Sequence, residues 1–435
     1  DVMAALTEPL PGTADLWEPE VRDWVDLEQQ ARRVFSSYGY SELRTPIFER
    51  TDVFVRSIGT ETDVVQKEMY TFEDRGGRSL TLRPEGTAGV IRAIANRGLS
   101  QGEQARVFYN GPMFRGERPA AGRRRQFHQI GVEAVGACTP LEDAEVISML
   151  VHYLAEIGIK DGRVLLNTRG VGEDRDAVAT ALQAHFAPDV EAMCEDCQRR
   201  LRTNVWRILD CKNEQCQSLV ETAPNMVDLV GPESKAFFAS ACAGLDALGV
   251  PYELAPRLVR GLDYYVHTVF EVIHSGLGAQ DALAGGGRYR ITLPGGKAPV
   301  DGVGFAAGME RLLMARAALG HATPDNGGTD VYVVTLGECA LAPGMRTAQR
   351  IRQADMGIRV LANHAERSMK AQMRAANREG AKITVIIGEA EIAAGTVVCK
   401  NMVTSEQESI SGDALVRWLQ QALLTNQTQP ATAQA

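Results

Sequence analysis

The stretch that decides the fold is residues 111–136, which read GPMFRGERPAAGRRRQFHQIGVEAVG. Its two ends have the composition of β-strands, and the arginine-rich middle around Gly122 has that of a connecting loop. Because alternate residues of a strand point to the same face, Phe127, Gln129 and Glu133 are expected to share one face. Buried charges are costly unless they are paired or bind a ligand. This face is therefore expected to line a binding site rather than an ordinary core.

The first strand of the pair presents a similar face. The same alternation places Met113, Arg115 and Glu117 together. Guanidinium groups, an aromatic ring and carboxylates suit a substrate with phosphate, an aromatic base and a polar head group. The alternative is an arginine-rich hairpin exposed to solvent, since runs of charge usually mark surface.

The order of residues in this hairpin resembles a known signature. Phe-Arg-x-Glu at residues 114–117, a short basic loop and Arg-x-x-x-Phe at residues 123–127 resemble the second motif of class II aminoacyl-tRNA synthetases. The continuation HQIGVE at residues 128–133 is similar to the version in histidyl-tRNA synthetases. This family resemblance extends from about Leu10 to Leu424.

Further motifs of the same family follow in order along the chain. They are RPEGT at residues 83–87, RGLDYY at 260–265, AGGGRY at 284–289 and GMER at 308–311. RGLDYY is the most specific of them and matches a histidine-specific motif. The family usually continues the third string with Tyr-Asp-Gly-Leu, whereas this chain has YRIT at residues 289–292. The departure is expected to change the local turn but to leave the tyrosine in place.

The resemblance implies the fold class. It is an α+β catalytic domain with a mixed, mainly antiparallel class II synthetase sheet, a helical insertion and a C-terminal α/β anticodon-binding domain. The predicted bounds are 1–169 and 251–323 for the two parts of the catalytic domain, 170–250 for the insertion, 330–424 for the anticodon-binding domain and 425–435 for a disordered tail.

Two local predictions come from hydrophobic patterning. Residues 17–38 are predicted to form an amphipathic helix whose apolar stripe includes Trp17 and Val25. Residues 43–48 are predicted to form an irregular or edge strand, because Pro46 lies within it. Beyond residue 330, strands alternate with helices, which is typical of a small and largely parallel sheet.

Bulk composition excludes some classes of protein. With 435 residues the chain is expected to hold more than one domain. Its net charge of −9 means that contacts with RNA must come from local basic patches. No run of about eighteen apolar residues is present, so no membrane span is predicted. No secretory signal is visible, and a cytoplasmic location is expected.

Paired cysteines mark the insertion. Their spacings of two and four residues are permitted for a structural zinc site, and four free thiols are the alternative; the cysteines are Cys194, Cys197, Cys211 and Cys216. Both interpretations stay open, and no metal ligands are assigned to the active site. The nearby arginines are either phosphate contacts or a solvated helix face; they are Arg199, Arg200, Arg202 and Arg207.

The resemblance also implies a two-step reaction. L-Histidine reacts with ATP to give histidyl-adenylate and pyrophosphate, and histidine is then transferred to the 3′ end of its tRNA. Arg115 and Arg260 are the implied catalytic residues, which would clamp the α-phosphate from two sides. Mg²⁺ would accompany ATP. A homodimer with histidine tRNA as partner is implied as well.

Two sets of binding residues follow from the same resemblance. The histidine pocket is predicted to consist of Glu85, Thr87, Gln129, Glu133, Tyr264, Tyr265 and Tyr289. The ATP site is predicted to consist of Arg115, Glu117, Arg123, Phe127 and Arg311. Glu85 has a purely structural alternative, because an acidic residue in this position can cap a helix.

Two other functions share parts of this pattern. One is a synthetase-like regulatory subunit of ATP phosphoribosyltransferase, which would bind histidine without transferring it. The other is an RNA-binding or scaffolding protein with an inactive site. The intact Arg115, Arg260 and Arg311 favour an active enzyme over both.

Overall fold

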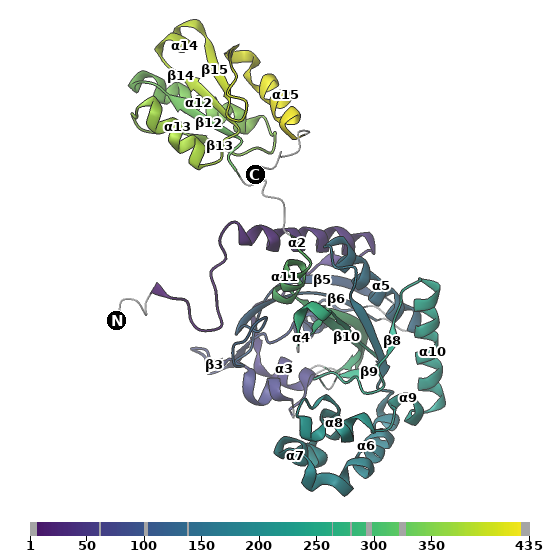
Figure 1. The fold of residues 1–435 in the computed structure, drawn as a ribbon. Helices are drawn as coiled ribbons and strands as arrows, with labels where there is room; N and C mark the ends of the chain where they lie inside the picture. Colours follow the sequence, from purple (N-terminus) through teal and green to yellow (C-terminus); the bar gives the residue numbers. More distant parts are fainter. Residues whose placement is uncertain are drawn as a thin grey trace. The chain divides into compact units, whose positions relative to one another are not determined.

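The computed structural model describes residues 7–427, except 61, 100–102, 137–138, 263, 279–280, 293–297 and 322–327. The chain divides into two compact units, Asp1–Thr323 and Pro324–Ala435 (Figure 1). The predicted disordered tail at 425–435 lies outside the described residues from 428 onward, and residues 425–427 continue the last helix.

An eight-stranded sheet forms the centre of the first unit. Its order is β1-β5-β6-β11-β10-β9-β7-β8, with parallel pairs at the two edges and antiparallel pairs between them. The mixed, mainly antiparallel sheet predicted from the sequence is therefore confirmed. The strands are β1 (Ser41–Glu42), β5 (Ala105–Phe114), β6 (Gln126–Val135), β7 (Arg163–Thr168), β8 (Glu253–Leu254), β9 (Tyr265–Ile273), β10 (Ala282–Ile291) and β11 (Val300–Gly308).

The hairpin of β5 and β6 has the two faces that the sequence predicts. The strands pair from Ala105 opposite Val135 to Phe114 opposite Gln126. On β6, the residues Ile130, Val132 and Ala134 are buried in the main hydrophobic cluster. The alternate residues face the opposite side, where Phe127, Gln129 and Glu133 line a cavity. The strands of the hairpin are thus not solvated, whereas Arg118 and Arg123 in the loop between them are exposed.

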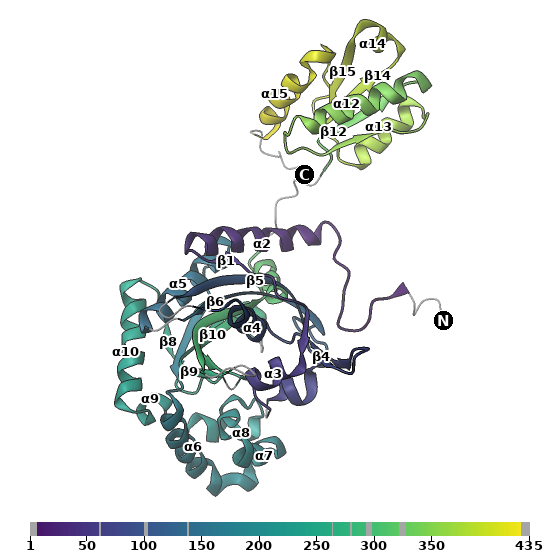
Figure 2. The same cartoon turned by 180° about the vertical axis from the view of Figure 1, so that it is seen from behind.

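Helices cover the apolar face of the sheet. The main cluster combines side chains of the sheet with those of α2 (Glu20–Ser37), α5 (Pro140–Glu156), α10 (Pro232–Ala247) and α11 (Met309–Ala318). In Figures 1 and 2, α5 and α10 lie side by side along the sheet. A capping box between Thr139 and Glu142 fixes the start of α5.

Two local predictions near the N-terminus are wrong in part. Helix α2 starts only at Glu20, so Trp17 precedes it and is 76% exposed, and Val25 is 44% exposed because it lies off the buried stripe. The strand predicted at 43–48 does not form. The segment instead leaves the main sheet after β1 and joins a second sheet at Phe48. Pro46 cannot donate a ladder hydrogen bond, so it suits the break between the two sheets.

Smaller elements surround the polar face of the main sheet. A three-stranded sheet has the order β2-β4-β3. Its strands and the neighbouring helices are β2 (Phe48–Arg50), β3 (Thr71–Glu73), β4 (Ser79–Leu82), α3 (Thr51–Ile58), the π-helical η1 (Val64–Glu68) and α4 (Thr87–Arg97). The buried hydroxyl of Thr81 forms hydrogen bonds of 2.9 Å with the hydroxyls of Thr51 and Thr71, which tie this sheet together.

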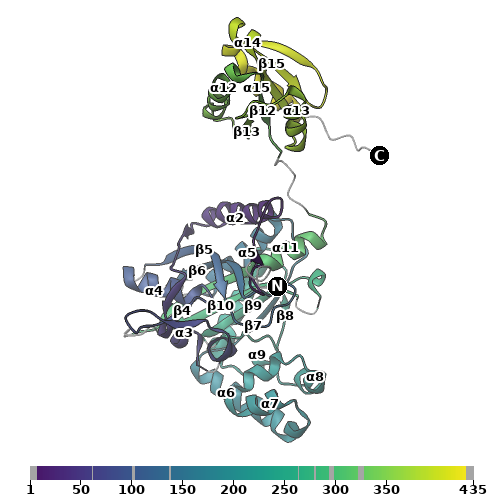
Figure 3. The same cartoon turned by 90° about the vertical axis from the view of Figure 1, so that its left-hand side faces the viewer.

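The insertion is helical and has its own hydrophobic cluster. The cluster consists of residues between Val178 and Val230, together with Val259. The insertion lies at the end of the sheet opposite α2 (Figure 3). Its elements are α6 (Gly172–Phe186), η2 (Ala187–Ala192), α7 (Glu195–Thr203), η3 (Val205–Asp210), α8 (Glu214–Glu221) and α9 (Met226–Leu229). The bounds 170–250 of the insertion stay a prediction. Within these bounds, helix α10 packs on the main sheet, because Phe238 and Leu245 belong to the main cluster.

The second unit is a five-stranded sheet with the order β13-β12-β14-β15-β16. Strand β12 is parallel to β13 and β14, but β15 and β16 are antiparallel, so the expected largely parallel sheet is wrong in part. The antiparallel pairing of β15 with β16 follows from a turn after Asn401, whose Oδ1 accepts from Val403 N at 2.9 Å and from Thr404 N at 3.2 Å.

The elements of this unit are β12 (Val331–Thr335), α12 (Leu341–Gln353), β13 (Val360–Ala362), α13 (Met369–Arg378), β14 (Ile383–Ile387), α14 (Glu389–Ala394), β15 (Thr396–Asn401), β16 (Gln407–Ser411) and α15 (Leu415–Gln427). Among the described residues of both units, no helix is long and apolar enough to cross a membrane.

We predict that Phe35→Ala destabilises the first unit by about 3–5 kcal/mol. The fully buried ring of Phe35 contacts those of Phe108, Tyr153 and Phe305, with centroids 5.7, 5.2 and 5.8 Å away. Val25→Ala on the exposed side of the same helix is the control and should change stability by less than about 0.5 kcal/mol. Urea unfolding followed by circular dichroism measures both, and equal effects would contradict this packing.

Candidate active site

A cavity of about 1250 Å³ opens on the polar face of the main sheet. It is larger than a site for one small ligand usually is, so two substrates can share it. Every site residue predicted from the sequence lines it: Glu85, Thr87, Arg115, Glu117, Arg123, Phe127, Gln129, Glu133, Arg260, Tyr264, Tyr265, Tyr289 and Arg311. Segments far apart in the sequence therefore meet here. Asp263 of the RGLDYY motif lies outside the described residues.

Glu85 is a helix cap that also faces the cavity. Its carboxylate accepts from Thr87 N at 2.9 Å and from Ala88 N at 2.8 Å, which satisfies the first turn of α4. Tyr264 Oη donates to the same carboxylate at 3.4 Å. Burial raises the pKa of Glu85, although the two backbone donors oppose the shift. Glu85 therefore caps a helix, which was the structural alternative, and it also lines the cavity.

Glu133 lies beside it on β6. Thr87 Oγ1 donates to Glu133 Oε1 at 2.6 Å. Burial raises the pKa of Glu133 to about 8, while the Thr87 hydroxyl acts in the opposite direction. Among the described residues, neither Glu133 Oε2 nor the buried Gln129 Oε1 meets the geometry of a hydrogen bond. Both atoms are buried, and burying a polar group without a hydrogen bond is costly, so this part of the cavity wall favours a polar partner.

Glycine stands opposite three of the large polar side chains of this face. The directly paired residues are Tyr109 with Gly131, Glu133 with Gly304, and Tyr289 with Gly302. In each pair, a Cβ added to the glycine would overlap with the polar side chain opposite. The strands thus leave room for these side chains to lie flat across the sheet. Tyr109 was not predicted as a site residue, and only its pairing with Gly131 would have indicated it.

Three tyrosines form one wall. The ring of Tyr264 contacts Tyr265 and Tyr289 edge to face, with centroids 4.7 and 5.8 Å away. All three rings are buried, and burial raises the pKa of each hydroxyl. Neutral hydroxyls can both donate and accept hydrogen bonds. This wall therefore suits a ligand with ring nitrogens.

Arg260 is held by an acidic partner on the neighbouring strand. Its Nη1 donates to Glu271 Oε1 at 2.9 Å. The guanidinium lies against Gly285, where a Cβ would overlap with it. Sequence reasoning missed Glu271, although a carboxylate flanked by apolar residues on both sides in β9 (VFEVI, residues 269–273) is a usable signal.

Arg115 is fixed by the backbone and an aromatic ring. Its Nε donates to Pro84 O at 2.9 Å, and its guanidinium carbon lies 5.3 Å from the centroid of Phe127. An arginine anchored in this way has fewer conformations to lose when it binds an anion. Phe127 is half-buried and leaves part of its ring toward the cavity.

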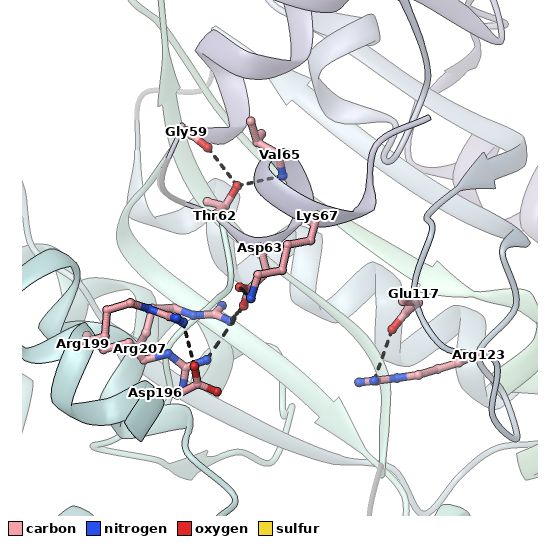
Figure 4. A network of polar contacts seen from close by, with 11 residues as sticks. Gly59, Thr62, Asp63, Val65, Lys67, Glu117, Arg123, Asp196, Arg199 and Arg207 are labelled. Carbon is pink, nitrogen blue, oxygen red and sulfur yellow. Dashed lines mark hydrogen bonds and ion pairs between the residues drawn. The ribbon is translucent and has the colours of Figure 1, made fainter. Parts of the chain in front are cut away.

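The loop arginines and α11 complete this end of the cavity. Glu117 Oε2 pairs with Arg123 Nη1 at 3.2 Å (Figure 4). Arg311 Nη1 donates to Ala282 O at 2.8 Å. Burial and the charge of Arg123 lower the pKa of Arg311. The neighbouring residue Glu310 stabilises the fold, which was not predicted from the sequence. Both of its carboxylate oxygens accept from His128 N at 3.1 Å, and these contacts tie α11 to β6.

The insertion borders the cavity through an ion-pair network (Figure 4). Arg207 Nη2 donates to Asp63 Oδ2 at 2.9 Å, and Arg200 lies 3.9 Å from the same oxygen. Arg199 pairs with Asp196 within the insertion at 2.7 Å. Arg207 and Asp63 both line the cavity. Arg200 and Arg207 are thus more than a solvated helix face.

The residues that depart from the family motif after Tyr289 lie at the end of a strand and beyond it. Strand β10 continues through Ile291, and Arg290 pairs with Asp301 directly opposite on β11. Arg290 Nε donates to Asp301 Oδ1 at 2.6 Å, and Nη2 donates to Oδ2 at 2.9 Å. The chain is thus a paired strand at this position, and Tyr289 lies in the cavity wall.

Comparisons with known proteins agree with this geometry. A family model described as Histidyl-tRNA synthetase matches residues 12–312. A second, described as Anticodon binding domain, matches residues 330–422. The solved structure of apo S. aureus histidyl-tRNA synthetase superposes with a TM-score of 0.78 at 38% identity, covering 95% of this chain and 99% of that one.

Similar sequences cover almost the whole chain. A histidine–tRNA ligase of Halothermothrix orenii is 45% identical over 411 residues, which is 94% of this chain and 98% of the relative. A histidine–tRNA ligase of Solidesulfovibrio magneticus is 46% identical over 422 residues, which is 97% of this chain and 99% of the relative. Together with the motifs gathered in one cavity, these matches show that the chain belongs to the histidyl-tRNA synthetase family.

Proposed function

We propose that the cavity binds ATP along its arginine side and histidine along its carboxylate and tyrosine side, with Arg115 and Arg260 acting on the phosphate between them. The chain is a histidine–tRNA ligase, an aminoacyl-tRNA synthetase that activates histidine with ATP before transferring it to tRNA. The observation that carries the residue assignment is the meeting of Arg115 and Arg260 with Glu85 and Glu133 in one cavity.

In the first step the carboxylate of histidine attacks the α-phosphate of ATP. Two anions must approach each other, and negative charge builds on the phosphoryl oxygens. Fixed positive charge and correct positioning are the available means of catalysis. Arg115, anchored on Pro84 O, and Arg260, anchored on Glu271, offer preorganised donors for those oxygens. Each would stabilise the charge of the transition state without first having to be ordered.

The nucleotide would lie between Phe127 and Arg311. The ring of Phe127 can stack on adenine, and Arg311 can cover the other side and reach the γ-phosphate. Glu117, paired here with Arg123 at 3.2 Å, can accept from the adenine amino group. Glu271, which also lines the cavity, fits an ion that accompanies ATP, because carboxylate oxygens near phosphates are ligands that Mg²⁺ prefers. Bound there, Mg²⁺ would neutralise charge on the pyrophosphate.

The histidine pocket follows the same chemical reasoning. Glu85, Thr87 and Gln129 suit the ammonium group of the amino acid. Glu133 and Tyr265 suit the two ring nitrogens, with Tyr264 and Tyr289 as walls. A site that bonds both nitrogens discriminates strongly against an amino acid lacking them, since its own buried polar groups would stay unpaired.

The wider setting of the reaction belongs to this proposal as well. Histidine tRNA is the acceptor of the second step, and the unit that matches the anticodon-binding domain would bind its anticodon arm. We include Mg²⁺ with ATP, a homodimer and a cytoplasmic location, as expected for the family. Exposed apolar side chains on the small sheet (Phe48 and Phe72) and directly before it (Ile47) support an interface with a second copy.

The test of this function is histidine-dependent exchange of pyrophosphate into ATP, followed by charging of tRNA. We predict exchange with histidine and none above background with other amino acids, and then charging of histidine tRNA. Absence of exchange would leave a histidine-binding regulator or an RNA-binding scaffold. Exchange without charging would indicate that the adenylate is passed to a different acceptor.

We predict that Arg115→Ala or Arg260→Ala lowers the exchange rate by at least roughly 10²-fold, because each removes a preorganised donor to the transition state. Arg260→Lys should recover only part of the rate, since an ammonium cannot form the same forked contact. Arg118→Ala, an exposed loop residue outside the cavity, is the matched control and should retain activity. Near-normal exchange in a folded Arg115→Ala or Arg260→Ala variant would contradict the assignment.

We also predict that Glu133→Gln stabilises the substrate-free protein at pH 8. The pKa of Glu133 is raised from 4.5 to about 8 in the folded chain. Between these values the folded chain binds more protons than the unfolded chain, so its stability falls as the pH rises. Glutamine keeps the contact to Thr87 without titrating. The Tm of the variant should therefore exceed that of the wild type at pH 8 and approach it toward pH 4.5.

The same variant separates stability from function. Glu133→Gln should raise KM for histidine while leaving KM for ATP near that of the wild type. Glu191→Gln, at an exposed position of the insertion, is the control and should change neither Tm nor KM appreciably. A Glu133→Gln protein that is less stable at pH 8 than at lower pH, relative to wild type, would contradict the assigned pKa.

A further inference from the structure

Four cysteines of the insertion meet in a compact cluster away from the proposed chemistry. Cys194 is the N-cap of α7 and Cys197 lies in its first turn. Cys211 directly follows η3, and Cys216 lies in α8. The four sulfur atoms all lie within 4.8 Å of one another. Two separate pairs in the sequence thus converge on one point.

The distances fit four thiolates around one ion. Bonds of about 2.3 Å in a tetrahedral zinc site place the sulfur atoms about 3.8 Å apart. Cys194 Sγ and Cys211 Sγ are 3.8 Å apart. A disulfide needs about 2.05 Å between its sulfur atoms, and all four cysteines are free thiols. The cluster therefore has the dimensions of a metal site and not of two disulfides.

Backbone groups support the sulfur atoms. Cys194 N donates to Cys216 Sγ at 3.4 Å, and Asn213 N donates to Cys211 Sγ at 3.4 Å. Hydrogen bonds of this kind favour the negatively charged thiolate and orient it. Cys197, Cys211 and Cys216 are buried, whereas Cys194 is half-buried. Several buried thiolates repel one another unless a cation neutralises them.

We propose that Cys194, Cys197, Cys211 and Cys216 bind one Zn²⁺ ion as a structural site of the insertion. Each thiol loses its proton as its sulfur binds the ion. Soft sulfur ligands in a tetrahedral arrangement select zinc over magnesium or calcium. Four protein ligands leave no open position for a substrate, so the ion has a structural and not a catalytic part.

The position of the site gives the ion a consequence for the active site. Three of the four cysteines belong to the hydrophobic cluster of the insertion, so the ion joins α7 to α8 through that cluster. The segment between the two cysteine pairs carries Arg207, which bonds Asp63 across the cavity edge. Lys212 directly follows Cys211 and lines the same cavity. Loss of the ion should therefore loosen this edge of the substrate cavity.

The first experiment measures metal in the full-length wild-type protein, purified without added metal and dialysed against a weak chelator. Elemental analysis should find about one zinc per chain, the stoichiometry of a four-thiolate site. After exchange with Co²⁺, the protein should show the strong visible bands of tetrahedral cobalt and a thiolate-to-cobalt charge-transfer band. Neither measurement depends on a variant that folds.

The second experiment assigns the ligands. Cys211→Ser and Cys216→Ser should each lose most of the zinc and lower the Tm of the first unit. Cys339→Ser, at an exposed cysteine of the second unit, is the matched control and should keep both. Wild-type protein without zinc, iron and sulfide in place of zinc, or a cobalt form without the charge-transfer band would each overturn the proposal.

Discussion

The structure depends on a packing constraint on one face of the main sheet, where large polar side chains lie across neighbouring strands. Each of them needs a glycine at the paired position, as in Glu133 opposite Gly304 and Tyr289 opposite Gly302. The opposite face of the same strands carries Ile130 and its apolar neighbours and packs under the helices. Because side chains alternate along a strand, the apolar residues that stabilise the domain lie on one face of the sheet and the polar residues of the cavity lie on the other.

The burial that makes the site specific also makes it costly to fold. Glu85 and Glu133 lie among buried tyrosines, and burial raises the pKa of both carboxyl groups. The two arginines differ from these carboxylates, because each has a protein partner for its charge or its N–H groups. Arg260 donates to Glu271, and Arg115 donates to Pro84 O. On the proposed assignment, the cavity is arranged for the charges of its substrates at some expense in the stability of the fold.

Much of this could be predicted from the sequence, for physical reasons that differ between elements. The alternation of β6 identifies Gln129 and Glu133 as one face, and distant motifs identify the residues that join them. Glu271 belongs to no predicted motif, and Tyr109 becomes visible only through its register with Gly131. The two wrong predictions of strands also concern strand pairing. The chain around Pro46 divides between two sheets, and the turn after Asn401 produces an antiparallel hairpin, so neither follows from local pattern alone.

The most direct test of the central claim is a crystal structure of the chain with a stable analogue of histidyl-adenylate. The account predicts the imidazole nitrogens within hydrogen-bond distance of Glu133 and Tyr265, and the linkage that replaces the α-phosphate between Arg115 and Arg260. An imidazole ring bound on the Phe127 side of the cavity, or a linkage contacted by neither arginine, would contradict it.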